Sequence, residues 1–507
     1  MKLHQKPSFG SVTCEIGAKV AIWGIRRTGF PPEDVPFFYR ASISSFPVGG
    51  PIHLAIGRPF FVISFSWAAD WPTYQHDYSR SGVAGESLLT PFNEKWVHKS
   101  KHEPRPAWRG EAKWDGYNKV YDMKSRQVFD YAYHTVIANG LLYFGSSADD
   151  KIYCLDAASG KERWVFFTEG PVRLAPTIAD GRVFVGSDDG NAYCLDAVTG
   201  KLIWKSRLGP KDYRIPGNGR IISRWPLRTG IVVIDDLAYC AAGMFPAEGI
   251  FISAIDVRNG KIQWQQKQGD LPAQGYLLAS HTRLYVPAGR NNPVVLNRSD
   301  GKRVRVVKGQ GGTYALLTGD SLVFGPGKTG TLGFVEPNKS DQLASFKGNH
   351  MIVTSEMSYL QGDTHLSALD RSRYLDLARK RSSLQSRQKG LSEKLKKLKP
   401  TSNSERKILQ KQLTELGQAI DRVTAEMGQC FPWKVNCDQP LSMILAGKTL
   451  ITGGHNSIAA FDASRGEKLW SGKADGDVFG LAAANGRLYV STNRGIIHCF
   501  EAKRLVK

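Results

Sequence analysis

The chain lacks several features that mark common protein classes. It has seven cysteines in 507 residues, but none are adjacent, none form a C-x-x-C pair, and none belong to a His/Cys cluster with metal-ligand spacing. No stretch outside the first 69 residues approaches the roughly 18 apolar residues of a membrane-spanning helix. No Ser/His/Asp order, carboxylate pair or phosphate-binding glycine loop stands out. The sequence therefore offers no support for a zinc module, a membrane-spanning helix in the main body or a common hydrolase site.

Acidic residues are also scarce. The chain has 46 Asp and Glu against 68 Lys and Arg, a formal net charge of +22. Such a charge favours nucleic acid or an acidic surface as a partner. However, residues 371–411 alone contain 14 Lys or Arg and three Asp or Glu, a net charge of +11. Half of the excess is thus local, which weakens the case for a basic binding face on the main body.

Glycine and aromatic residues are plentiful, and they recur in a repeat. The phrase "YCLDAASGKERW" ends at Trp164, and "YCLDAVTGKLIW" ends at Trp204. Decayed copies follow, such as "AIDVRNGKIQW" and "AFDASRGEKLW", each preceded by two short apolar segments separated by an Asn, Asp or Gly turn. A period of about 40 residues indicates stacked units. Each unit predicts a four-stranded antiparallel meander, so the chain is expected to be all-β.

Each residue type in the phrase has a structural role. Hairpin turns favour glycine where φ is positive, which explains four glycines, and turn amides favour a nearby carboxylate, which explains four aspartates. These are Gly160, Gly200, Gly260 and Gly466, with Asp156, Asp196, Asp256 and Asp462. The tryptophans Trp164, Trp204, Trp264 and Trp470 are large enough to wedge between neighbouring sheets. Cys154, Cys194 and Cys499 occupy one repeat position and are interpreted as small buried packing residues.

Eight units can be counted, from residues 131–165 to residues 476–502. The last lacks a fourth strand, and "PFNEKWVHKS", with Trp96, can supply it. Sheets packed radially around a channel form a β-propeller. We therefore predict an eight-bladed β-propeller over residues 70–507, closed by its amino-terminal strand. Cys430 and Cys437 are close enough in sequence for a disulfide, and the sequence leaves their pairing open.

The phrase D-x-x-T/S-G-K-x-x-W resembles the tryptophan-docking repeat of the quinoprotein-type, or pyrroloquinoline quinone (PQQ) repeat, eight-bladed propellers. "DWPTYQHDYSRSG" is similar to their usual mature start, and the resemblance covers residues 70–502. That family includes quinone-dependent alcohol dehydrogenases and non-enzymatic relatives such as the lipoprotein subunit of the outer-membrane protein assembly machinery. The resemblance implies the fold but does not choose between these activities.

The resemblance also implies what an enzyme of this family would need. Its dehydrogenases hold PQQ between a tryptophan and a vicinal disulfide, with Ca²⁺ on carboxylate and amide oxygens and an aspartate as base. This chain has no adjacent cysteines, and no position here matches the calcium ligands or the base. We expect no catalytic residue, no metal ligand and no cofactor, with PQQ and Ca²⁺ as the alternative.

Residues 1–69 carry no repeat. "GRPFFVISFSWAADW" contains an arginine, a short apolar run and Ser66-Trp67-Ala68, which is typical of a signal peptide followed by a cleavage site near Ala68 or Ala69. We interpret this segment as an export leader whose start codon is placed too far upstream, the alternative being a buried strand. The chain is then exported to the periplasm or cell envelope.

The sixth unit contains an insertion at residues 371–428, where the expected glycine turn and tryptophan strand are replaced. Leucines recur there at coiled-coil spacing, namely Leu377, Leu384, Leu391 and Leu398, then Leu409, Leu413 and Leu416 with Ile420, Val423 and Met427. "PTSNS", residues 400–404, supplies a turn and an N-cap, which predicts an antiparallel helical hairpin. It either buries only its own seam or docks a partner or an anionic surface; no recognition motif indicates specific nucleic-acid binding.

Equivalent positions at one end of the innermost strands should form a ring around the channel mouth. They include His134, Arg173, Arg228, Gln274, Tyr276, Tyr314 and His350, with Arg224 and Trp225 on the connection into the third unit. Such a ring suits an anionic or aromatic ligand, or it bonds only to water and neighbouring blades.

Together these features predict a monomeric, non-enzymatic scaffold of the cell envelope that binds a protein partner through its propeller rim or its hairpin. A PQQ-dependent dehydrogenase with an unusual site is the alternative, and adhesion or polyanion binding through the hairpin stays open.

Overall fold

The computed structural model describes residues 70–108, 114–115, 120–121, 127–289, 291–309, 311–312, 314–326, 330–398 and 402–503. The chain divides into two units, Met1–Phe65 and Ser66–Lys507. The expected export leader, with its cleavage site near Ala68 or Ala69, lies outside the described residues. All of the described residues belong to the second unit.

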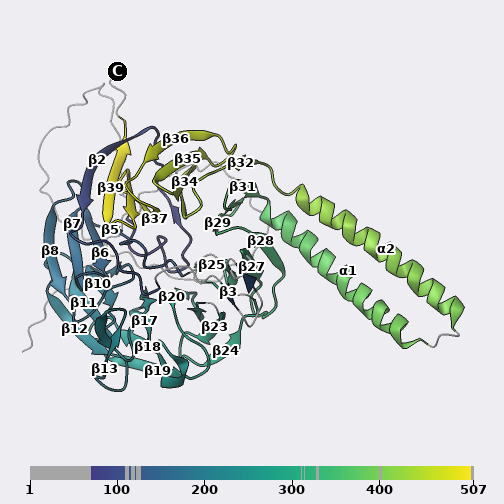
Figure 1. Ribbon diagram of the computed structural model, residues 1–507, viewed down its shortest axis with the longest axis horizontal. Helices are drawn as coiled ribbons and strands as arrows, with labels where there is room; N and C mark the ends of the chain where they lie inside the picture. The colour runs from purple at the N-terminus through teal and green to yellow at the C-terminus, as the bar shows by residue number, and fades with distance from the viewer. Residues whose placement is uncertain are drawn as a thin grey trace, which may run out of the picture. The chain divides into compact units, whose positions relative to one another are not determined.

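Among the described residues of this unit, eight four-stranded blades are arranged in a ring, and β1 adds a fifth strand to the sheet of one blade (Figure 1). Blade 1 consists of β5 (Val136–Ala138), β6 (Leu141–Ser146), β7 (Lys151–Asp156) and β8 (Glu162–Phe167). Blade 2 consists of β9 (Thr177–Ala179), β10 (Arg182–Gly186), β11 (Asn191–Asp196) and β12 (Leu202–Arg207). Blade 3 consists of β16 (Val232–Ile234), β17 (Leu237–Ala242), β18 (Ile250–Asp256) and β19 (Ile262–Gln268). Blade 4 consists of β21 (Leu278–Ala279), β22 (Arg283–Ala288), β23 (Asn291–Asn297) and β24 (Arg303–Val306).

The second half of the ring repeats the pattern. Blade 5 consists of β25 (Tyr314–Thr318), β26 (Ser321–Gly325), β27 (Thr331–Val335) and β28 (Ala344–Lys347). Blade 6 consists of β29 (His350–Val353), β30 (Ser358–Gln361), β31 (His365–Leu369) and β32 (Lys434–Asn436). Blade 7 consists of β33 (Ser442–Ala446), β34 (Thr449–Gly454), β35 (Ser457–Asp462) and β36 (Lys468–Lys473). Blade 8 consists of β37 (Val478–Ala484), β38 (Arg487–Thr492), β39 (Ile496–Ala502) and β2 (Phe92–Lys99). The predicted eight-bladed propeller is confirmed.

The ring closes through strands from opposite ends of the propeller. β2 runs antiparallel to β39, with Trp96 opposite Cys499. The amino-terminal strand therefore completes blade 8, as predicted. Additional short strands pair outside the four-stranded pattern. They are β1 (Val83–Ala84) with β33, β3 (Trp114–Asp115) with β4 (Val120–Tyr121), β13 (Arg214–Gly217) with β14 (Arg220–Ser223), and β15 (Thr229–Gly230) with β20 (Gly275–Tyr276). A single turn of 3-10 helix, η1, covers Pro246–Glu248.

Tryptophan and glycine join consecutive blades. The indole N–H of Trp164 donates to the carbonyl of Ala197 at 3.1 Å, and its ring lies where a side chain on Gly200 would be. Gly200 has φ of +70°, so the turn and the close indole both favour glycine. Trp96, Trp204 and Trp264 dock in the same way on Gly160, Gly260 and Gly301. Trp470 instead packs edge-on against Phe92 and Phe500.

The sixth blade keeps its docking tryptophan, contrary to the expectation that the insertion replaces it. Trp433 directly precedes β32, its indole N–H donates to the carbonyl of Ala463 at 3.2 Å, and its ring covers Gly466. The insertion sits between β31 and β32 and leaves the fourth strand intact. Only the glycine turn is lost.

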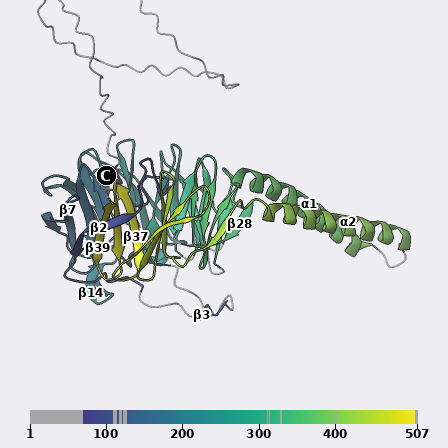
Figure 2. The same ribbon diagram turned by 90° about the horizontal axis from the view of Figure 1, so that it is seen from above.

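The insertion forms an antiparallel helical hairpin, α1 (Arg371–Lys397) and α2 (Asn403–Gly428), which extends away from the ring (Figures 1 and 2). The side chain of Asp370 caps α1 by accepting from the amide of Arg373 at 3.0 Å. Leu375, Ala378, Val423 and Met427 at its base pack into the core of blades 5 and 6. None of the helices in the described part of the chain has the length and apolar character needed to span a membrane.

The six cysteines in the described residues are free thiols, and all are buried. Cys154, Cys194 and Cys499 are packing residues, as interpreted from the repeat. Cys430 and Cys437, whose pairing the sequence left open, belong to different core clusters, so they do not form a disulfide.

Candidate functional site

An amino-terminal segment crosses the centre of the ring. Residues 70–84, called the strap here, form backbone hydrogen bonds with the innermost strands of five blades. Their partners are Ile137 in blade 1, Ile178 in blade 2, Ala279 in blade 4, Leu317 in blade 5 and Leu445 in blade 7. The strap therefore lies in the channel whose mouth was predicted to bind a ligand.

Arg80 fixes the strap to blade 4. Its side chain is 1% exposed, and its Nε donates to the carbonyl of Leu277 at 2.9 Å. Its Nη1 donates within the strap to Thr73 Oγ1 at 2.8 Å and to the Tyr74 carbonyl at 2.9 Å. Burial lowers the pKa of Arg80 to about 10, which leaves the guanidinium charged at neutral pH.

The strap also covers the aromatic part of the predicted ring. Tyr74 stacks on Tyr276 with ring centroids 3.6 Å apart and an interplanar angle of 4°. His134 lies edge-on to Tyr74 at 5.0 Å, and the guanidinium of Arg80 lies 5.6 Å from the Tyr276 centroid. Burial lowers the pKa of His134 to about 4, so its imidazole is neutral at pH 7.

Tyr314 and His350 form a separate aromatic pair from blades 5 and 6. Their rings lie edge-on at 5.1 Å. The hydroxyl of Tyr314 donates to the carbonyl of Met351, and His350 Nδ1 lies 2.7 Å from Gln361 Oε1. These two side chains are thus engaged with neighbouring blades.

A second group of predicted residues forms a buried ion-pair network at the start of the inner strands. Arg173 Nε lies 2.6 Å from Asp188 Oδ2, and Arg228 Nε lies 3.1 Å from Asp188 Oδ1. Arg173 Nη1 also contacts Asp130 Oδ2 at 3.2 Å. The side chains of these four residues are at most 1% exposed. The sequence predicted both arginines for the channel mouth, but it did not predict Asp130 or Asp188.

The charges in this network balance. Burial alone raises the pKa of Asp188, but Arg228 and Arg173 outweigh it and hold that pKa below its ordinary value. Burial raises the pKa of Asp130, and Arg173 offsets this only in part. The backbone of residues 105–107 covers the network, because the Arg105 carbonyl accepts from Arg173 at 2.7 Å and the Ala107 amide donates to Asp130 at 2.7 Å.

Several buried side-chain atoms at the channel have no hydrogen-bond partner among the described residues, including Arg80 Nη2, Asp130 Oδ1, His134 Nε2 and Gln274 Oε1. Buried polar atoms of this kind call for a water or a small ligand. Gln274, predicted for the ring, is thus buried with its side-chain oxygen unpartnered among the described residues.

Arg224 and Trp225 do not join the other predicted residues. Arg224 pairs with Glu248 and lies over the ring of Tyr213. Trp225 packs between blades 2 and 3 against Leu208 and Phe251. Their placement outside the channel differs from the expectation because β13 and β14 carry the connection outward before it enters blade 3.

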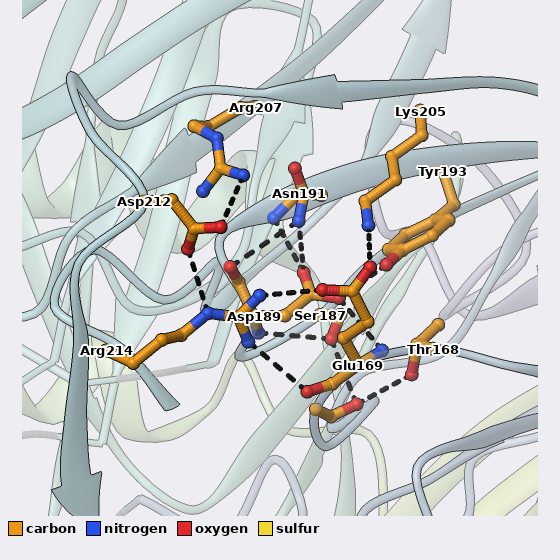
Figure 3. Close-up of polar contacts among 11 residues, drawn as sticks. Thr168, Glu169, Ser187, Asp189, Asn191, Tyr193, Lys205, Arg207, Asp212 and Arg214 are labelled. Carbon is orange, nitrogen blue, oxygen red and sulfur yellow. Dashed lines mark hydrogen bonds and ion pairs between the residues drawn. The ribbon is translucent and has the colours of Figure 1, made fainter. Parts of the chain in front are cut away.

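Next to Asp188, the side chain of Asp189 enters a different polar cluster (Figure 3). It accepts from Asn191 through the backbone amide at 2.8 Å and the side-chain amide at 2.9 Å, and from the hydroxyl of Tyr193. Ser187 and Thr168 bind the carbonyl of Gly170 beside it. Consecutive aspartates thus serve the channel network and the blade 2 cluster, a division that "SDDG" alone does not show.

The outer part of that cluster is a chain of ion pairs. Glu169 pairs with Lys205 and, at 2.7 Å, with Arg214; Arg214 and Arg207 both lie 2.9 Å from Asp212 (Figure 3). Hydrogen bonds from Arg207 and Arg214 lower the pKa of Asp212 to about 2. Every charge has an opposite partner, so this cluster anchors the β13–β14 hairpin.

A groove of about 970 Å³ lies between blades 5 and 6 at the base of the hairpin. Its lining includes Phe346, Lys347, Tyr374, Phe431 and Lys434. At this junction a small residue replaces a large one and the reverse: Ala344 occupies the position where most other blades have tryptophan, and Tyr374 occupies the position where the next blade has glycine. Tyr374 packs against Phe346 at 5.1 Å. This groove, called the blade 5/6 groove, was not expected from the sequence.

Comparisons with known proteins agree with this architecture. A family profile described as outer membrane protein assembly factor BamB, PQQ_2, matches residues 124–224 and 176–315. This profile matches the part of the chain that forms blades 1 to 4, and the structure shows that the fold as a whole is an eight-bladed β-propeller. No curated protein matches this chain by sequence.

Solved structures share the fold. The quinohemoprotein alcohol dehydrogenase from Comamonas testosteroni is 13% identical, with a TM-score of 0.55 over 86% of this chain and 82% of that one. Alcohol dehydrogenase ADHIIG from Pseudomonas putida HK5 is 13% identical, with a TM-score of 0.54 over 86% and 81%. A europium-containing methanol dehydrogenase is 10% identical, with a TM-score of 0.53 over 85% and 98%. At such identities the likeness shows the propeller fold of this chain and leaves its activity open.

The channel residues do not fit the quinone and calcium that the resemblance to PQQ-repeat propellers implies. Ca²⁺ takes six to eight oxygen ligands, yet no group of three or more His, Cys, Asp or Glu in the described residues could hold a metal. The carboxylates of Asp130 and Asp188 are already paired with arginines. One face of Tyr276, which a flat ring could use, is covered by Tyr74.

Proposed function

We propose that this protein is a non-enzymatic scaffold of the cell envelope that binds a protein partner through its propeller. The observation that carries the proposal is the filled channel, because the strap and the Arg173–Asp188–Arg228 network use the groups that a cofactor would need. The description of the matching family profile, an outer-membrane assembly factor, supports the same role and the same compartment.

The blade 5/6 groove is the surface that we assign to the partner. It combines the aromatic side chains of Phe346, Tyr374 and Phe431 with the exposed cations of Lys347 and Lys434. Partner segments are anchored by apolar side chains in pockets, while charges at the rim steer association. An extended segment that carries one large apolar residue beside acidic residues would complement this lining.

Titration of the full chain with PQQ and Ca²⁺, followed by calorimetry and absorbance, tests the non-enzymatic part of the proposal. We expect no saturable binding. The fold shared with quinohemoprotein dehydrogenases makes the opposite result the main alternative. One-to-one binding at micromolar affinity or better, lost in Arg228→Ala, would overturn the proposal and revive that alternative.

Crosslinking tests the groove. A photoreactive residue at Lys347 should capture one envelope protein reproducibly, whereas the same residue at exposed Lys261 on blade 3 should not. Phe431→Asp at the groove should abolish that capture without changing the fold. Equal capture from both positions would contradict a partner site between blades 5 and 6.

A further inference from the structure

The positive charge of the hairpin is confined to one helix. α1 contains ten Lys or Arg and two Asp or Glu, a net charge of +8, whereas α2 contains four of each and is neutral. The uneven charge is not needed for pairing of the two helices, because their shared seam is made of apolar residues at heptad spacing. α1 therefore carries a charge that its own fold does not explain.

Most of that charge is exposed and unpaired. Arg379 contacts Glu336 at 2.8 Å and Asp376 at 2.6 Å. Further along the described part of α1 no basic side chain has an acidic partner within ion-pair distance, which applies to Lys380, Arg381, Arg387, Lys389, Lys394, Lys396 and Lys397. All of these except Arg381 are exposed. At 1.5 Å per residue, the helix spans about 40 Å, so the charge forms a long basic rod outside the ring (Figure 2).

The rod is poorly suited to reading nucleic acid. Two packed helices side by side measure about 20 Å across, whereas the major groove of DNA is about 12 Å wide. Single strands are gripped by aromatic side chains. The one aromatic residue of α1, Tyr374, lies at its base and packs on Phe346.

The rod also lacks the anchors of a protein interface. Interfaces depend on large side chains that bury in partner pockets. In the described hairpin the only exposed large hydrophobic residue is Ile408, which lies on α2. The basic residues of α1, without aromatic stacking or apolar anchors beside them, suit a partner surface that is recognised by its negative charge density alone. Polybasic helices bind anionic membranes in this way, each cation contributing as it nears the surface.

We propose that the exposed face of α1 docks the protein on a membrane surface rich in anionic phospholipid. Lys and Arg contact the headgroup phosphates, and the hairpin lies along the surface without inserting. This places the propeller about one hairpin length or less from a bilayer. The inference is independent of the partner assigned to the blade 5/6 groove.

Vesicle co-sedimentation of the full chain tests this. We expect binding to phosphatidylcholine vesicles that contain about one third phosphatidylglycerol, little binding to pure phosphatidylcholine, and release at about 0.5 M salt because screening then acts within a few Å. Replacing Arg387, Lys389, Lys394, Lys396 and Lys397 by Gln should weaken the partition coefficient by about 100-fold or more.

A matched variant controls for net charge. It replaces Lys161, Lys201, Lys261, Lys448 and Lys473 by Gln, which are exposed lysines of the propeller, and it should lose less than about threefold. Gln is a good helix former, so the α1 variant should keep its helical circular dichroism. A second α1 variant, in which a short Gly-rich loop replaces residues 389–416, should lose binding equally.

Three results would overturn the proposal: no binding to anionic vesicles, equal binding to neutral vesicles, or unchanged binding after both α1 alterations. Binding to RNA or to an acidic protein without binding to anionic vesicles also overturns the proposal. Quinone binding would contradict the scaffold role but leave the membrane-docking proposal standing. A failed vesicle assay would contradict the membrane-docking proposal but leave the scaffold role standing.

Discussion

At the scale of residues, burial decides what the channel side chains can do. His134 is 7% exposed and packs between Tyr74 of the strap and the inner strand of blade 8, where a side chain on Gly480 would meet its Nδ1. Arg173 and Arg228 are likewise buried, but each has a carboxylate. The residues predicted at the channel mouth are therefore engaged with the protein's own chain, in aromatic contacts and in the ion-pair network, and their binding of a ligand stays a prediction.

The low pKa of His134 makes stability depend on pH. In the unfolded chain its pKa is near 6.5, while burial lowers the folded value to about 4. The unfolded state thus binds more protons between these values, and His134 costs stability as pH falls from about 6.5 to 4. The full loss is about 3 kcal/mol.

Urea unfolding at pH 7 and pH 4.5 measures this. His134→Gln should be less stable than the wild type at pH 7, but it should lose less stability on acidification. Equal losses in both proteins would show that His134 is not protonated on unfolding in this range.

At the scale of elements, the tryptophan-glycine contact joins one blade to the next. Trp204 is 7% exposed, donates to the Val257 carbonyl at 2.9 Å and covers Gly260. The motif was visible in the sequence because its residues are adjacent within each repeat. The sequence did not reveal Trp433 as the docking tryptophan of blade 6. It pairs across the sheet with Ala368, in the register of β31 and β32, and the hairpin separates the two by more than 60 residues in the chain.

Removing the Trp204 ring should therefore destabilise the ring of blades strongly. We expect Trp204→Ala to lower the free energy of unfolding by about 3–5 kcal/mol through lost burial and the cavity left behind. Trp204→Phe keeps an aromatic ring over Gly260 and loses the indole N–H bond, so it should cost less. Chemical denaturation monitored by fluorescence of the remaining tryptophans compares them; similar losses for Phe and Ala would mean that the hydrogen bond dominates.

At the scale of the whole molecule, two amino-terminal segments turn a row of blades into a closed unit. β2 supplies the outer strand of blade 8, and the strap pairs with five blades at the centre. Open repeat arrays are stabilised only by neighbour contacts, whereas here the ends are joined. We expect unfolding of the propeller to be cooperative.

Deleting residues 496–503 removes β39, to which β2 pairs, and should break this closure. The urea midpoint should fall and the transition should broaden, because blades can then open from one end. Hydrogen exchange should show blades 8 and 1 losing protection before blades 3 and 4. Uniform loss across all eight blades would argue that the strap alone keeps the ring cooperative.

The blades, their number and their closure were all predictable from the amino-acid sequence. Those properties depend on patterns within about 40 residues, where strand alternation, turn glycines and docking tryptophans can be read directly. The hairpin was equally readable from its apolar spacing. Tertiary folding, in contrast, set what lies in the channel, which carboxylates neutralise Arg173 and Arg228, and where blades 5 and 6 leave a groove. These features join residues far apart in the chain, and their contacts arise only once the ring has closed around the strap.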